Sequence, residues 1–169
     1  MKIFLIGFMG CGKSTLGRKL ATRLGYDLID LDHQIEKMTG STVANYFSAH
    51  GENVFRELER KTLQEFDFPK NCVIATGGGT PCFFDNMDWM NENGLTIYIE
   101  MTPLSLAKRL EQGIAKRPLL KNLSEEGLVL FIENKLAERD SFYKKAKVIL
   151  NGINLTPDQV HAVILAQEN

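Results

Sequence analysis

The sequence predicts an α/β domain in which helices cover both faces of a parallel β-sheet. Short, mostly apolar runs, as at residues 3–6 and 95–99, alternate with longer stretches of helical periodicity along the whole chain. This alternation is typical of a parallel sheet with helical crossovers. The chain has 169 residues, the ordinary size of one domain, and no internal repeat, low-complexity segment or linker interrupts it.

The first predicted strand, residues 3–6, leads into the segment Gly7-Phe8-Met9-Gly10-Cys11-Gly12-Lys13-Ser14, and a predicted helix follows from Thr15 to Leu24. A glycine-rich segment that ends in Lys-Ser between a strand and a helix indicates a phosphate-binding loop. Its glycines let backbone N–H groups approach an anion closely. The lysine brings a positive charge to the β- and γ-phosphates, and the serine offers a hydroxyl to Mg²⁺. The alternative, a glycine-rich turn without a ligand, agrees less well with the spacing and the flanking elements.

Two aspartates follow the second predicted strand, residues 27–30. Asp30 ends this strand, and Asp32 comes two residues later. Both therefore belong to the carboxyl edge of the predicted sheet, where open α/β proteins bind their ligands. The alternative for the pair is capping of the following helix.

A cluster of short helices is predicted between the second and third strands, at about residues 33–63. The helical pattern is interrupted near Gly40 and Gly51, and Ser41 is a candidate N-cap for one of these helices. The cluster is too long for a simple crossover, so it could form a wall of a substrate site.

The third predicted strand, residues 72–75, runs into Gly77-Gly78-Gly79. Consecutive glycines at the carboxyl end of a strand allow backbone N–H groups to approach a ligand, although a flexible loop is the alternative. A helical stretch near residues 84–92 and a fourth strand at 95–99 come next. Pro103 then begins a helix that extends to about residue 112.

Residues 113–123 break the periodicity and contain the basic segment Lys116-Arg117-Pro118-Leu119-Leu120. The segment is either a solvated connection or a mobile lid that delivers Arg117 to a phosphate. Ser124 then fits an N-cap for a helix that extends to about Lys144. This helix carries Arg139 and Tyr143, four residues apart on one face.

The last elements are a fifth strand at residues 148–150 and a final helix opened by Thr156-Pro157. The net charge of −1 gives no global attraction to nucleic acid or membrane surfaces, and no apolar run approaches the length of a membrane span. The chain enters its first strand directly, so we expect no targeting peptide. The three cysteines lack metal-ligand spacing. We therefore expect a cytoplasmic protein, monomeric because no exposed apolar stripe stands out.

Taken together, these motifs resemble those of the shikimate kinase family, which belongs to the P-loop, nucleoside-monophosphate-kinase-like group. The resemblance covers essentially the full length. It rests on the joint order of the phosphate loop, Asp30-x-Asp32, Phe55-Arg56-x-x-Glu59, Gly77-Gly78-Gly79, Arg117-Pro118-Leu119-Leu120 and Arg139-x-x-x-Tyr143. It implies a single domain, residues 1–169, with a three-layer αβα fold, a five-stranded parallel sheet of order 2-3-1-4-5 and a lid.

The resemblance also implies an activity, ATP-dependent phosphorylation of the 3-hydroxyl of shikimate in aromatic amino-acid biosynthesis, with Mg²⁺ as cofactor and ATP as co-substrate. The implied nucleotide-binding residues are Gly10, Cys11, Gly12, Lys13, Ser14, Thr15, Arg109 and Arg117. The implied substrate-binding residues are Asp32, Arg56, Gly77, Gly78, Gly79 and Arg139. Ser14 and Asp30, the latter through water, would hold the metal, and the catalytic residues would be Lys13, Asp32 and Arg117.

The chemistry of these residues agrees with the implied roles. The planar forks of Arg56 and Arg139 match the two oxygens of a carboxylate. Asp32 can accept hydrogen bonds from ring hydroxyls and act as a general base. Arg117 would neutralise charge on the transferring phosphoryl group. Family members often carry a basic residue in the turn at residues 151–157, which this chain lacks.

Several alternatives stay open at this point. Arg109 resembles the arginine that stacks on adenine. Arg56 and Arg139 each lie among acidic residues in the sequence, so either could belong to a solvated ion-pair face. A gluconate or nucleoside monophosphate kinase of the same fold is the nearest alternative function. A nucleotide-binding regulatory module without turnover is an alternative of another class.

Overall fold

The computed structural model describes residues 1–111 and 123–167. The predicted lid segment with Arg117 therefore lies outside the described residues, apart from its last position. The sheet consists of β1 (Lys2–Ile6), β2 (Asp27–Asp30), β3 (Cys72–Ala75), β4 (Leu95–Glu100) and β5 (Val148–Asn151). All of its strand pairs are parallel, and the order is β2-β3-β1-β4-β5. The predicted α/β class and the strand order 2-3-1-4-5 are confirmed.

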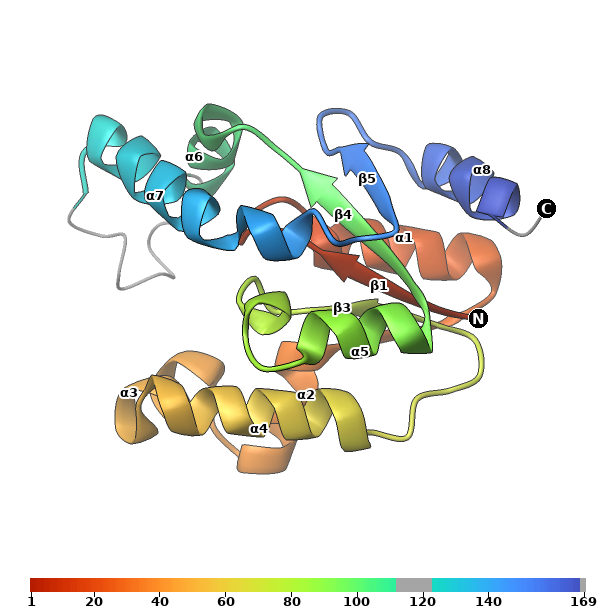
Figure 1. The fold of residues 1–169 in the computed structure, drawn as a ribbon, viewed down its shortest axis with the longest axis horizontal. Coiled ribbons are helices and arrows are strands. Elements are labelled where there is room, and N and C mark those ends of the chain that lie inside the picture. Colours follow the sequence, from red (N-terminus) through yellow and green to blue (C-terminus); the bar gives the residue numbers. More distant parts are fainter. Residues whose placement is uncertain (112–122, 168–169) are drawn as a thin grey trace.

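Helices flank the sheet on both sides (Figure 1). They are α1 (Lys13–Leu24), α2 (Leu31–Thr39), α3 (Val43–His50), α4 (Glu52–Glu65), α5 (Asn86–Asn93), α6 (Pro103–Glu111), α7 (Glu125–Tyr143) and α8 (Pro157–Gln167), with a short 3-10 turn, η1 (Thr80–Cys82), after β3. In the described part of the chain, none of these helices has the length and apolarity needed to cross a bilayer.

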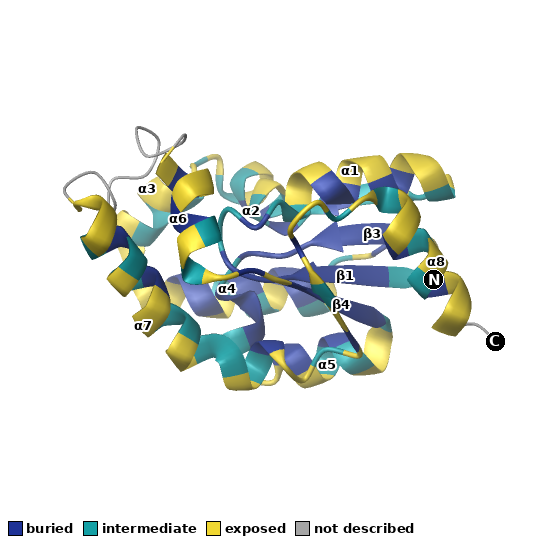
Figure 2. Cartoon of the chain, turned by 90° about the horizontal axis from the view of Figure 1, so that it is seen from above, coloured by how far each residue is buried: buried dark blue, intermediate teal, exposed yellow. Residues whose placement is uncertain are grey.

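The alternation of side chains along β1 divides the core into two clusters. Ile3 and Leu5 join the cluster that contains α1, α6, α8 and the first half of α7. Phe4 and Ile6 join the opposite cluster, with α2, α4, α5 and the end of α7. The central strands are buried almost throughout, as Figure 2 shows. Because both faces are covered, the strands consist of nearly continuous apolar runs.

The register places the predicted site segments at one edge of the sheet. Ala75, at the end of β3, pairs with Leu5 of β1 on one side and with Asp30 of β2 on the other. The loops that leave these three strands therefore start side by side. They are the phosphate loop, the Asp30–Asp32 segment and residues 77–79, so the strand order alone explains why these motifs meet.

The cap of α3 differs from the prediction. Thr42, not Ser41, is the N-cap, and its hydroxyl accepts from the backbone N–H of Asn45 at 3.2 Å. Gly40 ends α2 in the left-handed conformation, and Thr42, two residues later, has the extended backbone of a cap. The predicted cap Ser124 is confirmed and accepts from the N–H of Gly127 at 3.1 Å.

Candidate active site

The phosphate loop turns from β1 into α1 with its backbone in conformations that favour glycine. Gly10 and Gly12 have φ of 82° and 100°, and a Cβ on Gly10 would lie 2.8 Å from Cδ2 of Leu110. The ammonium of Lys13 donates to the carbonyl of Gly7 at 2.8 Å and to that of Phe8 at 3.0 Å. These bonds keep the positive charge over the loop, beside the N-terminus of α1, where an anion is favoured.

Ser14 joins the phosphate loop to the end of β2. Its hydroxyl donates to Oδ2 of Asp30 at 2.8 Å. The other carboxylate oxygen, Oδ1, accepts from the backbone N–H of His33 at 3.3 Å and caps α2. The capping alternative is therefore correct for Asp30, but capping leaves one of its oxygens directed at the hydroxyl of Ser14.

A pocket of about 570 Å³ opens beside this pair. It is lined by Ser14, Arg18, Leu28, Asp30, Asp32, His33, Gln34, Glu36 and Lys37. Arg56 and Arg139 are not among its lining residues, so it opens on the phosphate-loop side of the site. A hydroxyl and a carboxylate in the lining of an open pocket are ligands that suit a hard cation which keeps most of its water.

Residues 77–79 lie at the centre of the site, and the space beside them is occupied by charged side chains. A Cβ at position 77 would lie 2.8 Å from Oε1 of Glu59 and 3.2 Å from Oδ1 of Asp32. At position 78 it would lie 3.4 Å from Nη1 of Arg139, and at position 79 it would lie 2.5 Å from Nη2 of Arg56. The structure thus brings two guanidinium groups and two carboxylates against three consecutive glycines.

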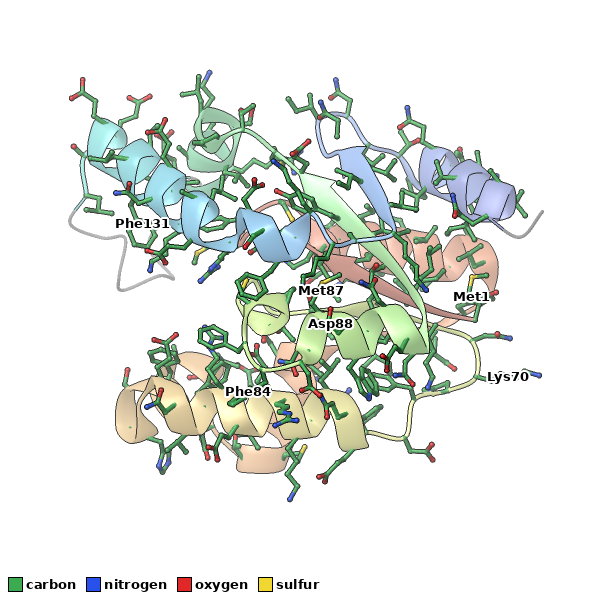
Figure 3. All side chains as sticks on the ribbon, viewed as in Figure 1. Met1, Lys70, Phe84, Met87, Asp88 and Phe131 are labelled. Atoms are coloured by element: carbon green, nitrogen blue, oxygen red, sulfur yellow. The ribbon has the colours of Figure 1, made fainter. Side chains whose placement is uncertain are left out.

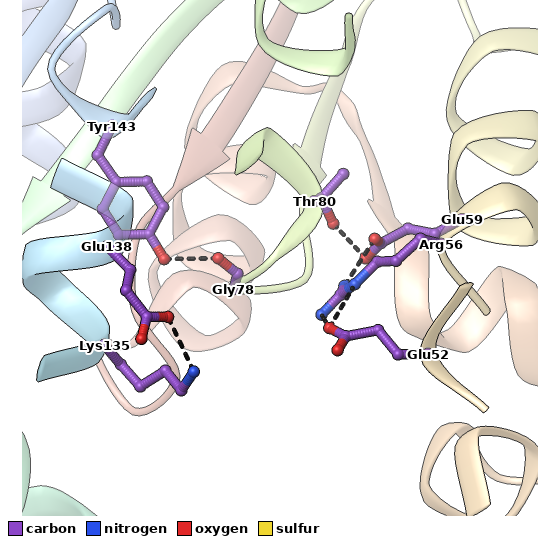
Figure 4. A network of polar contacts seen from close by, with 8 residues as sticks. All are labelled: Glu52, Arg56, Glu59, Gly78, Thr80, Lys135, Glu138 and Tyr143. Carbon is purple, nitrogen blue, oxygen red and sulfur yellow. Dashed lines mark hydrogen bonds and ion pairs between the residues drawn. The ribbon is translucent and has the colours of Figure 1, made fainter. Parts of the chain in front are cut away.

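Arg56 is buried rather than part of a solvated face, with 8% of its surface exposed. Its Nη1 donates to Oε2 of Glu59 at 2.8 Å, and Glu59 is 1% exposed. Oε1 of Glu59 accepts from the hydroxyl of Thr80 at 2.6 Å (Figure 4). Glu52 faces Nε and Nη2 of Arg56 at a looser 3.4 Å, and its side chain is half exposed. The ion-pair alternative predicted a solvated surface pair and is wrong.

Arg139 approaches the glycines from α7, on the other side of the site. Its acidic neighbours pair with other cations, Glu138 with Lys135 at 2.8 Å and Asp140 with Lys144 at 2.6 Å. The guanidinium carbon of Arg139 lies 5.5 Å from the centroid of the Phe8 ring in the phosphate loop. Arg139 is therefore placed between the phosphate loop and residues 77–79.

Tyr143, one turn after Arg139 in α7, fixes the glycine segment to that helix. Its side chain is fully buried, and its hydroxyl donates to the carbonyl of Gly78 at 2.5 Å (Figure 4). The ring packs on Tyr98 of β4 with centroids 5.0 Å apart. This bond fixes the peptide unit after Gly78 through its carbonyl. It uses none of the N–H groups of residues 77–79, which can therefore donate to a ligand.

Asp32 lies in the first turn of α2. Burial is the main cause that raises the pKa of its carboxyl from 3.8 to about 6, and the carboxylates of Glu59 and Asp30 add to the shift, while Lys13 opposes it. A carboxyl group whose charged form is disfavoured in this way is a better proton acceptor than an ordinary aspartate, and it titrates close to neutral pH.

Arg109 lies beside the phosphate loop as well. From α6, its Nη1 donates to the carbonyl of Cys11 at 2.9 Å and its Nη2 to the carbonyl of Gly152 at 3.2 Å. Gly152 belongs to the turn after β5, where the sequence offers no basic residue. A guanidinium from another element thus reaches that turn.

Three further predicted nucleotide-binding residues are Cys11, Thr15 and Arg117. Cys11 is buried within the loop, and Thr15 is exposed in the first turn of α1. Arg117 lies outside the described residues. Glu59 and Tyr143 belong to recognised motifs but have no role predicted from the sequence, and no sequence signal marks Thr80. The spacing of Glu59, three residues after Arg56, indicates that the two side chains share one face of a helix, but it does not show that this face is buried.

Fold and site together define a P-loop phosphotransferase that acts on a small acceptor. The chemistry of a phosphate loop suits the phosphates of a nucleotide, and two guanidinium groups beside a carboxylate suit an anionic acceptor that carries hydroxyls. These groups belong to loops and helices that leave one edge of the sheet.

Comparisons with known proteins narrow this class. The family model for shikimate kinase matches residues 9–168. A shikimate kinase of Parabacteroides distasonis is 44% identical over 163 residues, which cover 96% of this chain and 94% of that protein. The crystal structure of shikimate kinase from Bacteroides thetaiotaomicron has a TM-score of 0.93 at 40% identity, covering 100% of this chain and 99% of that chain. Shikimate kinase from Acinetobacter baumannii in complex with shikimate has a TM-score of 0.85 at 32% identity, covering 98% and 93%. The chain belongs to the shikimate kinase family.

The raised pKa of Asp32 predicts how stability depends on pH. Folding favours the neutral carboxyl, so this contribution is complete below pH 3.8 and is lost as the pH rises through about 6. Asp32→Asn removes the disfavoured charge. We expect its Tm to exceed that of the unmodified protein at pH 8 by about 3–6 °C, and the gap to close towards pH 4.

Differential scanning fluorimetry between pH 4 and pH 8 measures this effect. Asp67→Asn, at an exposed position, is the matched control. A gap in Tm that does not change with pH, or an asparagine variant that is less stable at pH 8, would contradict the assignment.

Proposed function

We propose that the ATP-dependent shikimate kinase activity of this chain is a direct, in-line transfer of the γ-phosphoryl group to the 3-hydroxyl of shikimate. The observation that carries this proposal is the convergence of Asp32, Arg56 and Arg139 on residues 77–79, next to the phosphate loop. Such transfers depend mainly on positioning and on charge stabilisation. The products are shikimate 3-phosphate and ADP.

The acceptor's carboxylate binds between Arg56 and Arg139. Arg56 keeps one nitrogen on the buried Glu59, while the half-exposed Glu52 holds the opposite edge at 3.4 Å. Glu52 is the weaker partner, so the substrate carboxylate displaces it and takes that edge with two parallel hydrogen bonds. The N–H groups of Gly77, Gly78 and Gly79 are available to the same carboxylate or to a ring hydroxyl.

Asp32 accepts hydrogen bonds from the ring hydroxyls, including the one that attacks. With a pKa raised to about 6, it is mostly ionised at neutral pH and still basic enough to take the proton as the new P–O bond forms. Asp32 is close enough to both Lys13 of the phosphate loop and Glu59 of the acceptor site for their charges to affect its pKa. A hydroxyl of shikimate that is bonded to Asp32 would therefore face the γ-phosphate on the loop.

The nucleotide's phosphates lie on the loop. Backbone N–H groups from Gly10 to Thr15 and the ammonium of Lys13 bind the β- and γ-phosphates at the N-terminus of α1. Arg109 stacks on adenine, because its in-plane bonds to Cys11 and Gly152 orient the face of the guanidinium.

Mg²⁺ is the cofactor. The hydroxyl of Ser14 and the carboxylate of Asp30, 2.8 Å apart, form a donor pair that suits one direct ligand and one contact through water. When bound, Mg²⁺ neutralises the charge that develops between the β- and γ-phosphates.

The proposed function also includes the domain organisation, oligomeric state, location and partners of the protein. We infer that residues 1–169 form one domain that works as a cytoplasmic monomer, with shikimate and ATP as its partners and with neither nucleic acid nor membrane. The reaction then serves aromatic amino-acid biosynthesis by way of chorismate. The net charge of −1 and the unpaired cysteines support this setting.

ADP release tests the function directly. With MgATP and purified protein, we expect release that depends on shikimate, and background rates with gluconate, with a nucleoside monophosphate and without an acceptor. Release with another acceptor would keep the phosphate-loop assignment and overturn the acceptor site. Binding of ATP without release under any condition would favour a regulatory module.

Arg56→Ala tests the carboxylate site. Loss of a charged hydrogen-bonding group raises the KM for shikimate roughly 10- to 100-fold and leaves the KM for ATP within about twofold. Lys61→Ala, an exposed position on the same helix, is the matched control and should change neither constant. An unchanged KM for shikimate in Arg56→Ala would remove this residue from the site.

Arg117→Ala tests transition-state stabilisation by the lid. We expect kcat to fall roughly 100-fold or more, because one donor to a developing charge is lost, while the KM for shikimate changes less than about threefold. Lys116→Ala supplies the neighbouring cation as a control. Equal losses in kcat and in shikimate affinity would argue against this role.

A further inference from the structure

Helix α4 carries two arginines one turn apart, and each lies over a phenylalanine of the loop between η1 and α5. The guanidinium carbon of Arg56 is 4.2 Å from the ring centroid of Phe83, and that of Arg60 is 5.1 Å from the ring centroid of Phe84. Phe84, labelled in Figure 3, lies next to α4. Two consecutive aromatic residues therefore contact two successive turns of one helix.

The backbone of the loop explains how neighbouring side chains reach the same helix. Phe83 is extended, with φ of −122°, whereas Phe84 is in the left-handed region, with φ of 52°. Successive side chains of an extended chain point to opposite sides, and the left-handed residue breaks that alternation. The conformation costs free energy in a bulky residue, so contacts elsewhere must hold it.

The contacts that hold it are on the outer turn of α4. The carboxylate of Asp85 accepts from Nη2 of Arg60 and from Nε2 of Gln64, both at 3.0 Å. Arg60 and Asp85 are partly exposed, as is Phe84, with 53% of its surface exposed. We call Arg60, Gln64, Phe84 and Asp85 the outer clasp; it anchors the loop at a distance of one helical turn from Arg56.

The inner contact, between Phe83 and Arg56, is a cation–π contact, with the guanidinium carbon 4.2 Å from the ring centroid. All N–H groups of arginine lie in the guanidinium plane, and there Nη1 is used by Glu59 while Nε and Nη2 face Glu52. An aromatic ring attracts the cation through the face and uses none of these donors. Phe83 can thus hold the plane of Arg56 and leave its outer edge for a carboxylate.

We propose that Phe83 is a positioning residue for the acceptor, because its ring holds the guanidinium plane of Arg56 in the orientation that receives the substrate carboxylate. The outer clasp holds the loop that presents this ring. The inference rests on the proposed function, since it takes Arg56 as a carboxylate-binding residue.

Phe83→Leu and Phe83→Tyr distinguish this role from simple filling of space. Leucine keeps apolar volume and removes the aromatic face, whereas tyrosine keeps the face. We expect Phe83→Leu to raise the KM for shikimate roughly three- to tenfold, with kcat and the KM for ATP within about twofold. Phe83→Tyr should have a KM for shikimate within about twofold of that of the unmodified protein.

Phe66→Leu is the matched control, since that ring packs on Phe68 at 4.9 Å at the far end of α4. Thermal unfolding of each variant verifies that it is folded. A leucine variant that is folded and has an unchanged KM for shikimate would overturn the inference, as would equal rises in the leucine and tyrosine variants.

The double variant Arg56→Ala/Phe83→Leu separates this inference from the function on which it rests. If Phe83 acts through Arg56, adding Phe83→Leu to Arg56→Ala raises the KM no further. Additive effects would contradict a role through Arg56. An Arg56→Ala variant with an unchanged KM would overturn the carboxylate assignment itself, whereas a raised KM in Arg56→Ala beside an unchanged KM in Phe83→Leu would overturn only the positioning role.

Discussion

The close approach of charged side chains to a backbone segment without side chains is the constraint on which the rest of the site depends. Cβ atoms at positions 77 and 79 would come within 2.8 Å of Glu59 and 2.5 Å of Arg56, and Asp32 and Arg139 lie only slightly farther from the segment. These groups come from α2, α4 and α7, which no local sequence signal links. They meet because β3 lies between β2 and β1 in the sheet, and because the loop that leaves it occupies almost no volume.

This convergence creates an electrostatic asymmetry between the two central carboxylates. Glu59 is buried, but it is satisfied by Nη1 of Arg56 and by the hydroxyl of Thr80. Asp32 is penalised by burial and by the charges of Glu59 and Asp30. If Asp32 is the base that we propose, an acceptor hydroxyl that donates to it would favour its ionised form, and acceptor binding would be coupled to ionisation. The protein gives up stability at this position and retains a carboxylate ready to accept a proton.

The sequence predicts the fold well because its signals are local and agree with one another. The bounds of β2 and β3 coincide with the predicted ranges, since β2 begins and ends with an aspartate and β3 is an apolar run that stops just before Thr76 and the glycines at 77–79. The error at Ser41 comes from backbone geometry one residue away, which composition does not encode. Burial of Arg56 was not predictable from neighbouring glutamates, because a helix face that meets solvent and one that meets a loop have the same sequence pattern. Phe83 and Phe84 both contact arginines of α4, and the left-handed backbone at Phe84 that accompanies these contacts is predicted by no residue-type rule.

In Arg56 and Arg109, the edge and the face of the planar guanidinium group have different contacts. The guanidinium carbon of Arg56 lies over the ring of Phe83, and its outer edge, which Glu52 now holds at 3.4 Å, is the part that the acceptor would use, as we propose. Arg109 does the reverse, because its edge is bonded to the carbonyls of Cys11 and Gly152. Its face is the part that a nucleobase would use, as we propose. A lysine has neither a planar edge nor a face, so it could replace neither arginine. The same bond to Gly152 explains how the turn after β5 can lack a basic residue, since α6 supplies the guanidinium from outside that turn.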